Sequence, residues 1–222
     1  MRDRTVKNLV FGLAGTLLLL AVVILGWGDW ETFFSNPARK GAIILAMAGA
    51  IAYGFSGSSG LGTGQLEDRS SRWIFIPIII IAVAFAWLPP YLDRLNRWAV
   101  GGDVVRYVGL IMLAIGGFVR VATVFELGNR FSIFIGLQSD HRLKTDGLYG
   151  LLRHPSYFGM LTAMAGWTLV FRSVIGFFLI VAMCLPIAAL IHAEEDLLVR
   201  GFGEQYRAYQ QRTRWRLLPF VY

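Results

Sequence analysis

Charged residues and cysteines are scarce in this sequence. Only 16% of its 222 residues are Asp, Glu, Lys or Arg, whereas 56% are hydrophobic. Soluble domains carry about a quarter charged residues, so the chain falls outside that class. So large an apolar fraction also excludes a disordered chain. The single cysteine, Cys184, excludes a disulfide or a cysteine-based zinc site within one chain.

Several motifs of soluble enzymes are also missing. The three histidines, His141, His154 and His192, lie far apart, and no His-Glu-x-x-His sequence occurs, so we expect no metal site. No Gly-x-Ser-x-Gly sequence marks a hydrolase nucleophile. The glycine-rich segment 57–64 is not followed by a Walker lysine, and we interpret it as a flexible cytoplasmic loop.

Long apolar segments dominate what remains. Three stretches without a charged residue, 8–28, 41–66 and 73–92, contain 21, 26 and 20 residues. A helix needs about 20 apolar residues to cross the hydrocarbon layer, so each predicts a transmembrane helix. The first is longer than the apolar region of a signal peptide and has no cleavage site of small residues after it.

Three further helices complete the prediction. The segment 103–125 contains Arg106 and Arg120, which we expect to extend toward opposite interfaces. The segments 155–171 and 173–191 are separated only by Arg172, which predicts an antiparallel helical hairpin. The sequence therefore predicts an all-α, polytopic membrane protein with about six transmembrane helices and a C-terminal hairpin.

Basic residues indicate the orientation of these helices. The formal net charge is +7, and a cytoplasmic N-terminus would place 14 Lys or Arg residues on the inner side and 5 on the outer side. Cytoplasmic loops are enriched in Lys and Arg, so both termini are expected in the cytoplasm. The bilayer accounts for the basic character, and no nucleic-acid partner is expected.

Polar residues cluster in the second half of the chain. We interpret residues 1–222 as one domain, with scaffold helices in 1–125 and a functional core in 126–222. Three polar segments flank the hairpin: His141-Arg142-Leu143-Lys144-Thr145-Asp146-Gly147-Leu148-Tyr149, Arg153-His154-Pro155-Ser156-Tyr157-Phe158-Gly159, and Glu194-Glu195-Asp196 followed by Phe202-Gly203-Glu204-Gln205-Tyr206-Arg207-Ala208-Tyr209. The hairpin would bring the last two together in a cytoplasmic pocket at the membrane surface.

Each segment also has a simpler interpretation. Arg153 and His154 would serve as interfacial anchors, and Glu194–Asp196 as the solvated start of a C-terminal helix. The tyrosines would form an aromatic belt at the membrane interface.

Taken in order, the three segments resemble the isoprenylcysteine carboxyl methyltransferase family, part of a broader group with the phospholipid N-methyltransferases. The resemblance covers roughly residues 128–220 and implies an S-adenosyl-L-methionine-dependent methyltransferase acting on a lipophilic small-molecule or lipidated acceptor. It implies catalytic roles for Arg153, Glu194 and Glu195. It also implies cofactor contacts from His141, Arg142, Leu143, Lys144, Tyr149, His154, Pro155, Ser156, Tyr157 and Glu194.

One position departs from the family pattern. The family places an arginine that holds the substrate carboxylate four residues before the first aligned glutamate, and here that residue is Leu190. Arg120, Arg153 and His192 are possible replacements. The alternatives left open are a phospholipid N-methyltransferase of the phosphatidylethanolamine type, a reductase of similar architecture, and a non-catalytic membrane scaffold.

Overall fold

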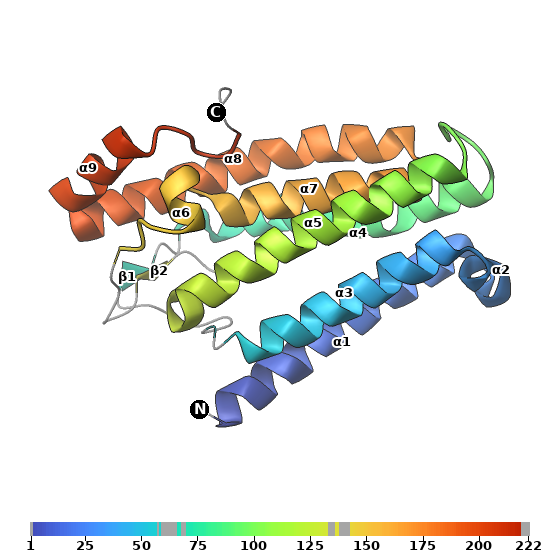
Figure 1. The fold of residues 1–222 in the computed structure, drawn as a ribbon, viewed down its shortest axis with the longest axis horizontal. Coiled ribbons are helices and arrows are strands. Elements are labelled where there is room, and N and C mark those ends of the chain that lie inside the picture. Colours follow the sequence, from blue (N-terminus) through green and yellow to red (C-terminus); the bar gives the residue numbers. More distant parts are fainter. Residues whose placement is uncertain are drawn as a thin grey trace.

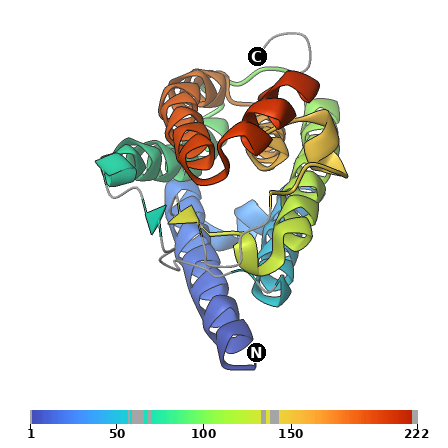
Figure 2. The ribbon, with the colours of Figure 1, turned by 90° about the vertical axis from the view of Figure 1, so that its left-hand side faces the viewer.

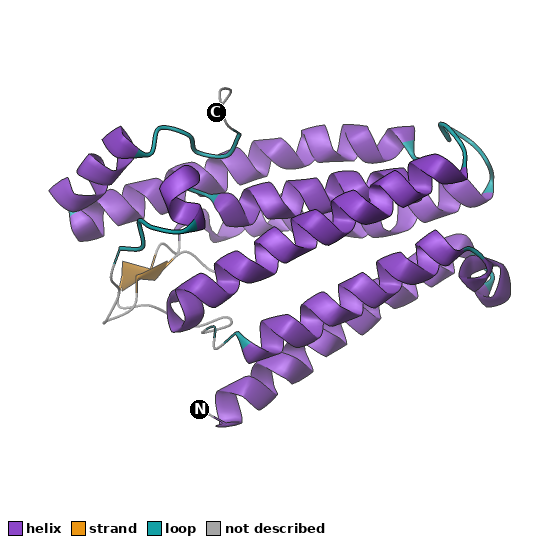
Figure 3. Cartoon of the chain, in the orientation of Figure 1, coloured by secondary structure: helices purple, strands orange, loops and turns teal. Residues whose placement is uncertain are grey.

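A bundle of long helices forms the protein (Figures 1 and 3). This computed structural model describes residues 2–56, 58, 66–67, 70–132, 136–137 and 143–218. The segment 57–64, expected to be a flexible loop, lies outside the described residues except for Ser58. In chain order the elements are α1 (Arg2–Trp27), α2 (Trp30–Ser35), α3 (Pro37–Phe55), β1 (Leu66–Glu67), η1 (Ser70–Ile74), α4 (Phe75–Arg94), α5 (Asp103–Leu127), η2 (Gly128–Arg130), β2 (Gly136–Leu137), α6 (Leu148–Leu151), α7 (Pro155–Val170), α8 (Val174–Phe202) and α9 (Glu204–Arg212).

Five of the described helices are long and apolar enough to cross a membrane. These spans are Val6–Trp27, Pro37–Phe55, Ser71–Arg94, Asp103–Arg130 and Val174–Phe202. Their outer faces carry exposed apolar side chains such as Leu25, Phe118 and Leu185, which suit contact with lipid. The all-α membrane fold predicted from the sequence is therefore confirmed.

The helix predicted over 155–171 is shorter than the other five predicted helices. Helix α7 has 16 residues, which corresponds to about 24 Å of helix. It lies inside the bundle and forms the predicted hairpin with α8 (Figure 1). Pro186 is accommodated within α8, which runs without a break for 29 residues.

Helices α5 and α7 pack backbone against backbone. Four glycines, which we call the glycine seam, face the partner helix: Gly109, Gly116, Gly159 and Gly166. A Cβ atom added to Gly116 would lie 2.3 Å from the Ala163 nitrogen, and one added to Gly159 would lie 2.7 Å from the Arg120 nitrogen. Small residues permit this approach of helices within a bilayer. The seam fixes the position of α5 relative to the start of α7.

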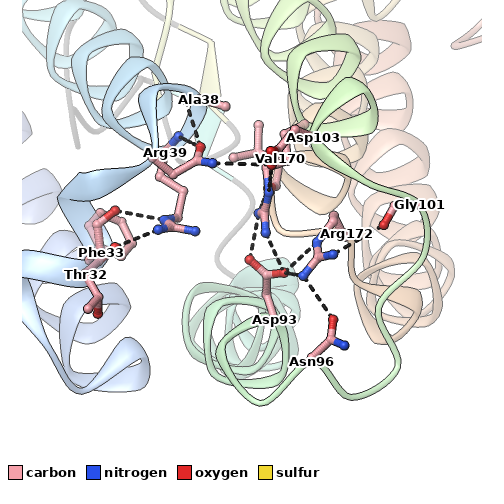
Figure 4. Close-up of polar contacts among 12 residues, drawn as sticks. Thr32, Phe33, Ala38, Arg39, Asp93, Asn96, Gly101, Asp103, Val170 and Arg172 are labelled. Carbon is pink, nitrogen blue, oxygen red and sulfur yellow. Dashed lines mark hydrogen bonds and ion pairs between the residues drawn. The ribbon is translucent and has the colours of Figure 1, made fainter.

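Ion pairs tie the helices together at the end of the bundle that carries α2 (Figure 4). The buried carboxylate of Asp93 lies 2.7 Å from Arg106 Nη1 and 2.7 Å from Arg172 Nη2. Arg106 also donates to the Val170 carbonyl oxygen over 2.6 Å. Arg106 thus lies near the end of α5, as expected, but its guanidinium turns into the bundle instead of toward water. The network joins α4, α5 and the turn between α7 and α8.

The opposite end of the bundle carries the connections between the helices. The start of α1, β1, β2, α6 and α9 all lie there (Figure 1). Figure 2, which looks at this end, shows α9 beside the end of α8. Strands β1 and β2 form a two-residue antiparallel pair, with Leu66 opposite Leu137. Gly203, at φ +52, turns the chain from α8 into α9. The described parts of the three polar segments of the sequence therefore meet at one end of the bundle.

Candidate active site

A cavity of about 300 Å³ opens at this end of the bundle. Its volume lies at the lower limit for small-molecule sites. The walls come from α4, α5, the segment around residue 130, β2, the segment around residue 144, α6, α7, α8 and α9. The lining residues are Phe75, Ile78, Arg120, Leu127, Arg130, Phe131, Ser132, Gly136, Leu143, Lys144, Tyr149, Arg153, His154, Ser156, Tyr157, Met160, Glu194, Leu197, Leu198, Tyr206 and Tyr209.

The start of α7 is held by the C-terminal segment. The backbone nitrogens of Arg153 and His154 donate to the carbonyl oxygens of Trp215 and Arg216, over 2.9 and 2.8 Å. Pro155 occupies the first turn of α7. Proline has no backbone N–H, but the N–H groups of the first turn have no partner within the helix, so no helical hydrogen bond is lost. These contacts fix the Arg-His-Pro sequence against α9 and the residues that follow it.

Glu195 forms the centre of a buried ionic cluster. Its carboxylate lies 2.9 Å from Arg153 Nε, 3.2 Å from His154 Nε2 and 3.1 Å from Arg216 Nη2. The residue is only 4% exposed and does not line the cavity. Glu195 therefore holds α8, the start of α7 and the C-terminal segment together.

Glu194 presents its carboxylate to the cavity. Its side chain is 37% exposed, and Oε2 accepts a hydrogen bond of 3.1 Å from the Tyr157 hydroxyl. His154 Nδ1 lies 3.7 Å from the same oxygen. Two neighbouring glutamates thus have different surroundings, and the open one is available to a cationic or hydroxyl-bearing ligand.

Tyrosines form much of the remaining polar wall. Burial, helped by the Glu194 carboxylate, raises the pKa of Tyr149, and burial also raises the pKa of Tyr209. Both phenols are therefore neutral at physiological pH, and Tyr209 donates to the Tyr149 carbonyl oxygen over 2.6 Å. Tyr149, Tyr157, Tyr206 and Tyr209 all line the cavity. This placement overturns the interpretation of these tyrosines as an aromatic belt.

The predicted site residues divide into three groups. Those that line the cavity are Leu143, Lys144, Tyr149, Arg153, His154, Ser156, Tyr157 and Glu194. Pro155 and Glu195 are buried next to the cavity without lining it. His141 and Arg142 lie outside the described residues. The alternative that Glu194–Asp196 starts a C-terminal helix is wrong, because these residues lie inside α8.

Some lining residues were not predicted as site residues. The apolar wall of Phe75, Ile78 and Met160 comes from segments that look like ordinary membrane helix in the sequence. Arg120 could have been recognised as a functional residue from the sequence, because a charged residue inside a membrane span is unusual. The Nη1 group of Arg120 donates to the Ser156 hydroxyl, and its guanidinium lies 5.4 Å from the centre of the Phe131 ring.

The residues suggested as replacements for the missing arginine occupy different places. Leu190 is buried against Ile74 and Leu197 and does not line the cavity. His192 lies in a separate, shallow groove on the other side of α8, together with Asp196 and Arg200. Within the residues that the structure describes, no group of three or more His, Cys, Asp or Glu side chains is arranged to hold a metal ion.

The known proteins to which this chain is similar are methyltransferases. Residues 104–205 match the family model of phospholipid methyltransferases. A protein of Oryza sativa subsp. indica named "Probable protein-S-isoprenylcysteine O-methyltransferase" is 34% identical over 153 residues, covering 64% of this chain and 76% of the relative. Protein-S-isoprenylcysteine O-methyltransferase B of Arabidopsis thaliana is 34% identical over 120 residues, covering 47% and 55%.

A solved structure shares the fold. It is the eukaryotic intramembrane Ras methyltransferase, an isoprenylcysteine carboxyl methyltransferase, and it superposes with a TM-score of 0.57 at 20% identity. The match covers 92% of this chain and 74% of the other.

Proposed function

Because this chain belongs to the protein-S-isoprenylcysteine O-methyltransferase family, we propose that its cavity binds S-adenosyl-L-methionine and that it methylates the carboxylate of a lipophilic acceptor. Family membership and fold make the chain an integral membrane methyltransferase. The cofactor, the acceptor and the side of the membrane are the proposed parts.

The observation that carries the proposal is the open carboxylate of Glu194 in a cavity with both polar and apolar walls. S-adenosyl-L-methionine is a cation with an ammonium group, ribose hydroxyls and an adenine ring. A carboxylate suits the ammonium or the hydroxyls, and tyrosine faces suit the ring or the cation. The donor set of the cavity therefore fits this cofactor.

The residues divide the work of binding and positioning. Glu194 would accept hydrogen bonds from the cofactor, with Tyr157 and His154 beside it to fix its orientation. Tyr149, Tyr206 and Tyr209 would enclose the rest of the cofactor. Glu195 would not contact the cofactor but would hold Arg153 and His154, which line the cavity, in place.

The main catalytic task of the protein would be to align the methyl group of the cofactor with the acceptor. When bound, the cofactor supplies a methyl group that is already activated on a sulfonium. A carboxylate acceptor is ionised at neutral pH, so no residue has to remove a proton from it. The enzyme must bring the two reactants together from different phases, the cofactor from water and the acceptor from lipid.

We place the cavity on the cytoplasmic side. The predicted excess of 14 basic residues over 5 supports this side, because cytoplasmic loops are rich in Lys and Arg. The start of α1, the loops of the site and α9 lie at one end of the bundle, so they would share that side (Figure 1).

Cofactor binding by Glu194 is tested by calorimetric titration of the purified protein in detergent. Glu194→Gln should weaken binding of S-adenosyl-L-methionine by roughly tenfold to a hundredfold, because a charge-assisted hydrogen bond is lost. Glu204→Gln, an exposed glutamate at the start of α9, is the matched control and should bind as the wild type does. Equal affinities for the Glu194 variant and the wild type would refute the proposed cofactor site.

The reaction is tested with membranes and a methyl-labelled cofactor. A carboxylate acceptor gives a methyl ester, from which base releases the label, whereas a lipid amine gives a base-stable N-methyl product. Label that resists base would refute the carboxylate acceptor and favour the phospholipid alternative.

A further inference from the structure

Arg120 is a cation of the cavity wall to which the described part of the chain supplies no anionic partner. It lies within the α5 span, and the residues that the structure describes place no carboxylate in ion-pair contact with it. Its hydrogen bond goes to the neutral Ser156 hydroxyl, and its guanidinium carbon lies 5.4 Å from the centre of the Phe131 ring. By contrast, Arg106 in the same helix is paired with Asp93 at 2.7 Å.

A guanidinium within a candidate span that has no ion-pair partner among the described residues requires an explanation. Charged side chains within membrane spans are costly and are normally paired or placed on a functional path. A guanidinium carries five N–H donors in a fixed fork, and the bond to Ser156 uses one of them. Because Arg120 lines the cavity, its other donors are available to a ligand there.

The surroundings of Arg120 indicate the kind of ligand. Phe75, Ile78, Met160, Leu197 and Leu198 form an apolar part of the same cavity, and all but Met160, which lies on the shorter helix α7, come from helices long enough to span a membrane. A ligand with an anionic head and a hydrocarbon tail would satisfy both features. The guanidinium fork matches a carboxylate with two parallel hydrogen bonds.

We infer that Arg120 binds the carboxylate of the methyl acceptor and that the apolar wall holds the acceptor's hydrocarbon chain. This inference rests on the proposed function. It assigns to Arg120 the binding of the substrate carboxylate, for which the family has an arginine at the position of Leu190. Arg153 is already paired with Glu195, and His192 lies outside the cavity. Arg120 therefore remains as the anchor among the three replacements.

The cavity lining includes both a carboxylate, that of Glu194, and the guanidinium of Arg120. Glu194 offers a negative group to the cationic cofactor, and Arg120 offers a positive group to the anionic acceptor. The glycine seam supports this geometry, because Gly159 packs against the backbone of Arg120 and Ser156 holds its guanidinium. Arg120 is thus a specificity residue whose backbone and side chain are both fixed by α7.

The test compares Arg120→Gln and Arg120→Lys with the wild type in detergent, using a small prenylcysteine analogue with a free carboxylate. Arg120→Gln should lower kcat/KM for this acceptor by about tenfold to a hundredfold. Arg120→Lys should recover part of the loss, because it restores the charge but not the fork. The affinity for S-adenosyl-L-methionine should stay within about twofold, which separates acceptor binding from the cofactor site. Arg200→Gln, outside the cavity, is the matched control.

An unchanged kcat/KM for the carboxylate analogue in Arg120→Gln would overturn the inference. If the same variant lost activity toward phosphatidylethanolamine vesicles, Arg120 would be assigned to a lipid phosphate instead.

Binding of acceptor analogues to the wild type provides a second test, which does not depend on whether any variant folds. The free carboxylate analogue should bind at least about tenfold more tightly than the corresponding carboxamide, even without cofactor. Equal affinities would overturn the role of Arg120. Failure of the wild type to bind S-adenosyl-L-methionine would instead refute the proposed function, and the two failures are therefore distinguishable.

Discussion

Glu194 and Glu195 show how one residue of difference along a helix changes the role of a side chain. Neighbouring residues on a helix point about 100° apart. On α8 this rotation directs Glu194 into the cavity and Glu195 into the buried cluster with Arg153 and Arg216. We therefore expect one carboxylate to affect ligand binding and the other to affect stability.

Removal of the Glu195 charge should destabilise the protein. Glu195→Ala would leave Arg153, His154 and Arg216 without their common partner, and breaking a buried ion pair costs about 3–5 kcal/mol. Thermal unfolding in detergent, followed by tryptophan fluorescence, should show a clear drop in Tm. Asp196→Ala, one position further along and exposed, should unfold like the wild type. Equal Tm values for both variants would contradict the structural role of Glu195.

An arginine at position 190 should not restore the family's substrate anchor. From the sequence alone, Leu190→Arg would be expected to improve turnover of a prenylcysteine analogue if the site had room. The structure changes this expectation, because Leu190 is buried against Ile74 and Leu197. A charge placed there has no partner and costs about 2.5–3.5 kcal/mol at mid-helix.

We therefore expect Leu190→Arg to lower the Tm and to leave kcat/KM for the analogue unimproved. Steady-state assays and thermal unfolding on the same preparations would check both points. Improved turnover would show that the new guanidinium reaches the acceptor.

At the scale of whole elements, the seam between α5 and α7 positions the site. Gly116 and its neighbour Gly117 provide a matched pair, because a Cβ on Gly116 would clash with the Ala163 backbone whereas one on Gly117 meets nothing within 4 Å. Forcing extra atoms into a packed contact costs about 1–3 kcal/mol. Alanine in an open helical position instead gains up to about 1 kcal/mol over glycine.

Gly116→Ala should therefore lower the Tm, and Gly117→Ala should keep or raise it. Gly116→Ala should also weaken turnover of the carboxylate analogue, because a wider separation of α5 from α7 moves Arg120 away from Ser156. Unfolding curves and kcat/KM values for the two variants provide the check. A Tm for Gly116→Ala at or above the Gly117→Ala value would argue against the seam.

At the scale of the whole molecule, the two ends of the bundle differ in construction. The end with α2 is closed by the network of Asp93 with Arg106 and Arg172 (Figure 4). The other end holds the cavity, most of whose polar lining comes from the chain after residue 126. Three lining residues, Phe75, Ile78 and Arg120, come from the first 125 residues, so the scaffold helices also shape the site.

The orientation of the molecule can be measured directly. Reporter fusions at the C-terminus and within the segment 128–147 should both give cytoplasmic signals, because 14 of the basic residues are predicted on that side and 5 on the other. A fusion in the turn near Arg172 should give the opposite signal. A periplasmic or luminal signal from the C-terminus would contradict the proposed orientation.

The sequence by itself determined the features that depend on local composition. Apolar windows without charges define membrane helices because each residue contributes to insertion independently of its partners. The short connection at Arg172 is enough to predict the hairpin of α7 and α8. The order of the Arg-His-Pro and Glu-Glu segments indicated the methyltransferase family, to which the chain belongs.

Only the tertiary structure decided which side chains face the cavity. The separation of Glu194 from Glu195, the lack of an ion-pair partner for Arg120 among the described residues, and the burial of Leu190 depend on how each helix is rotated about its axis. That rotation is set by contacts between segments far apart in the chain. Examples are the glycine seam of α5 and α7 and the backbone hydrogen bond from the Arg153 nitrogen to the Trp215 carbonyl oxygen. Local composition carries no information on these contacts, because every helix in a bilayer is apolar over most of its surface.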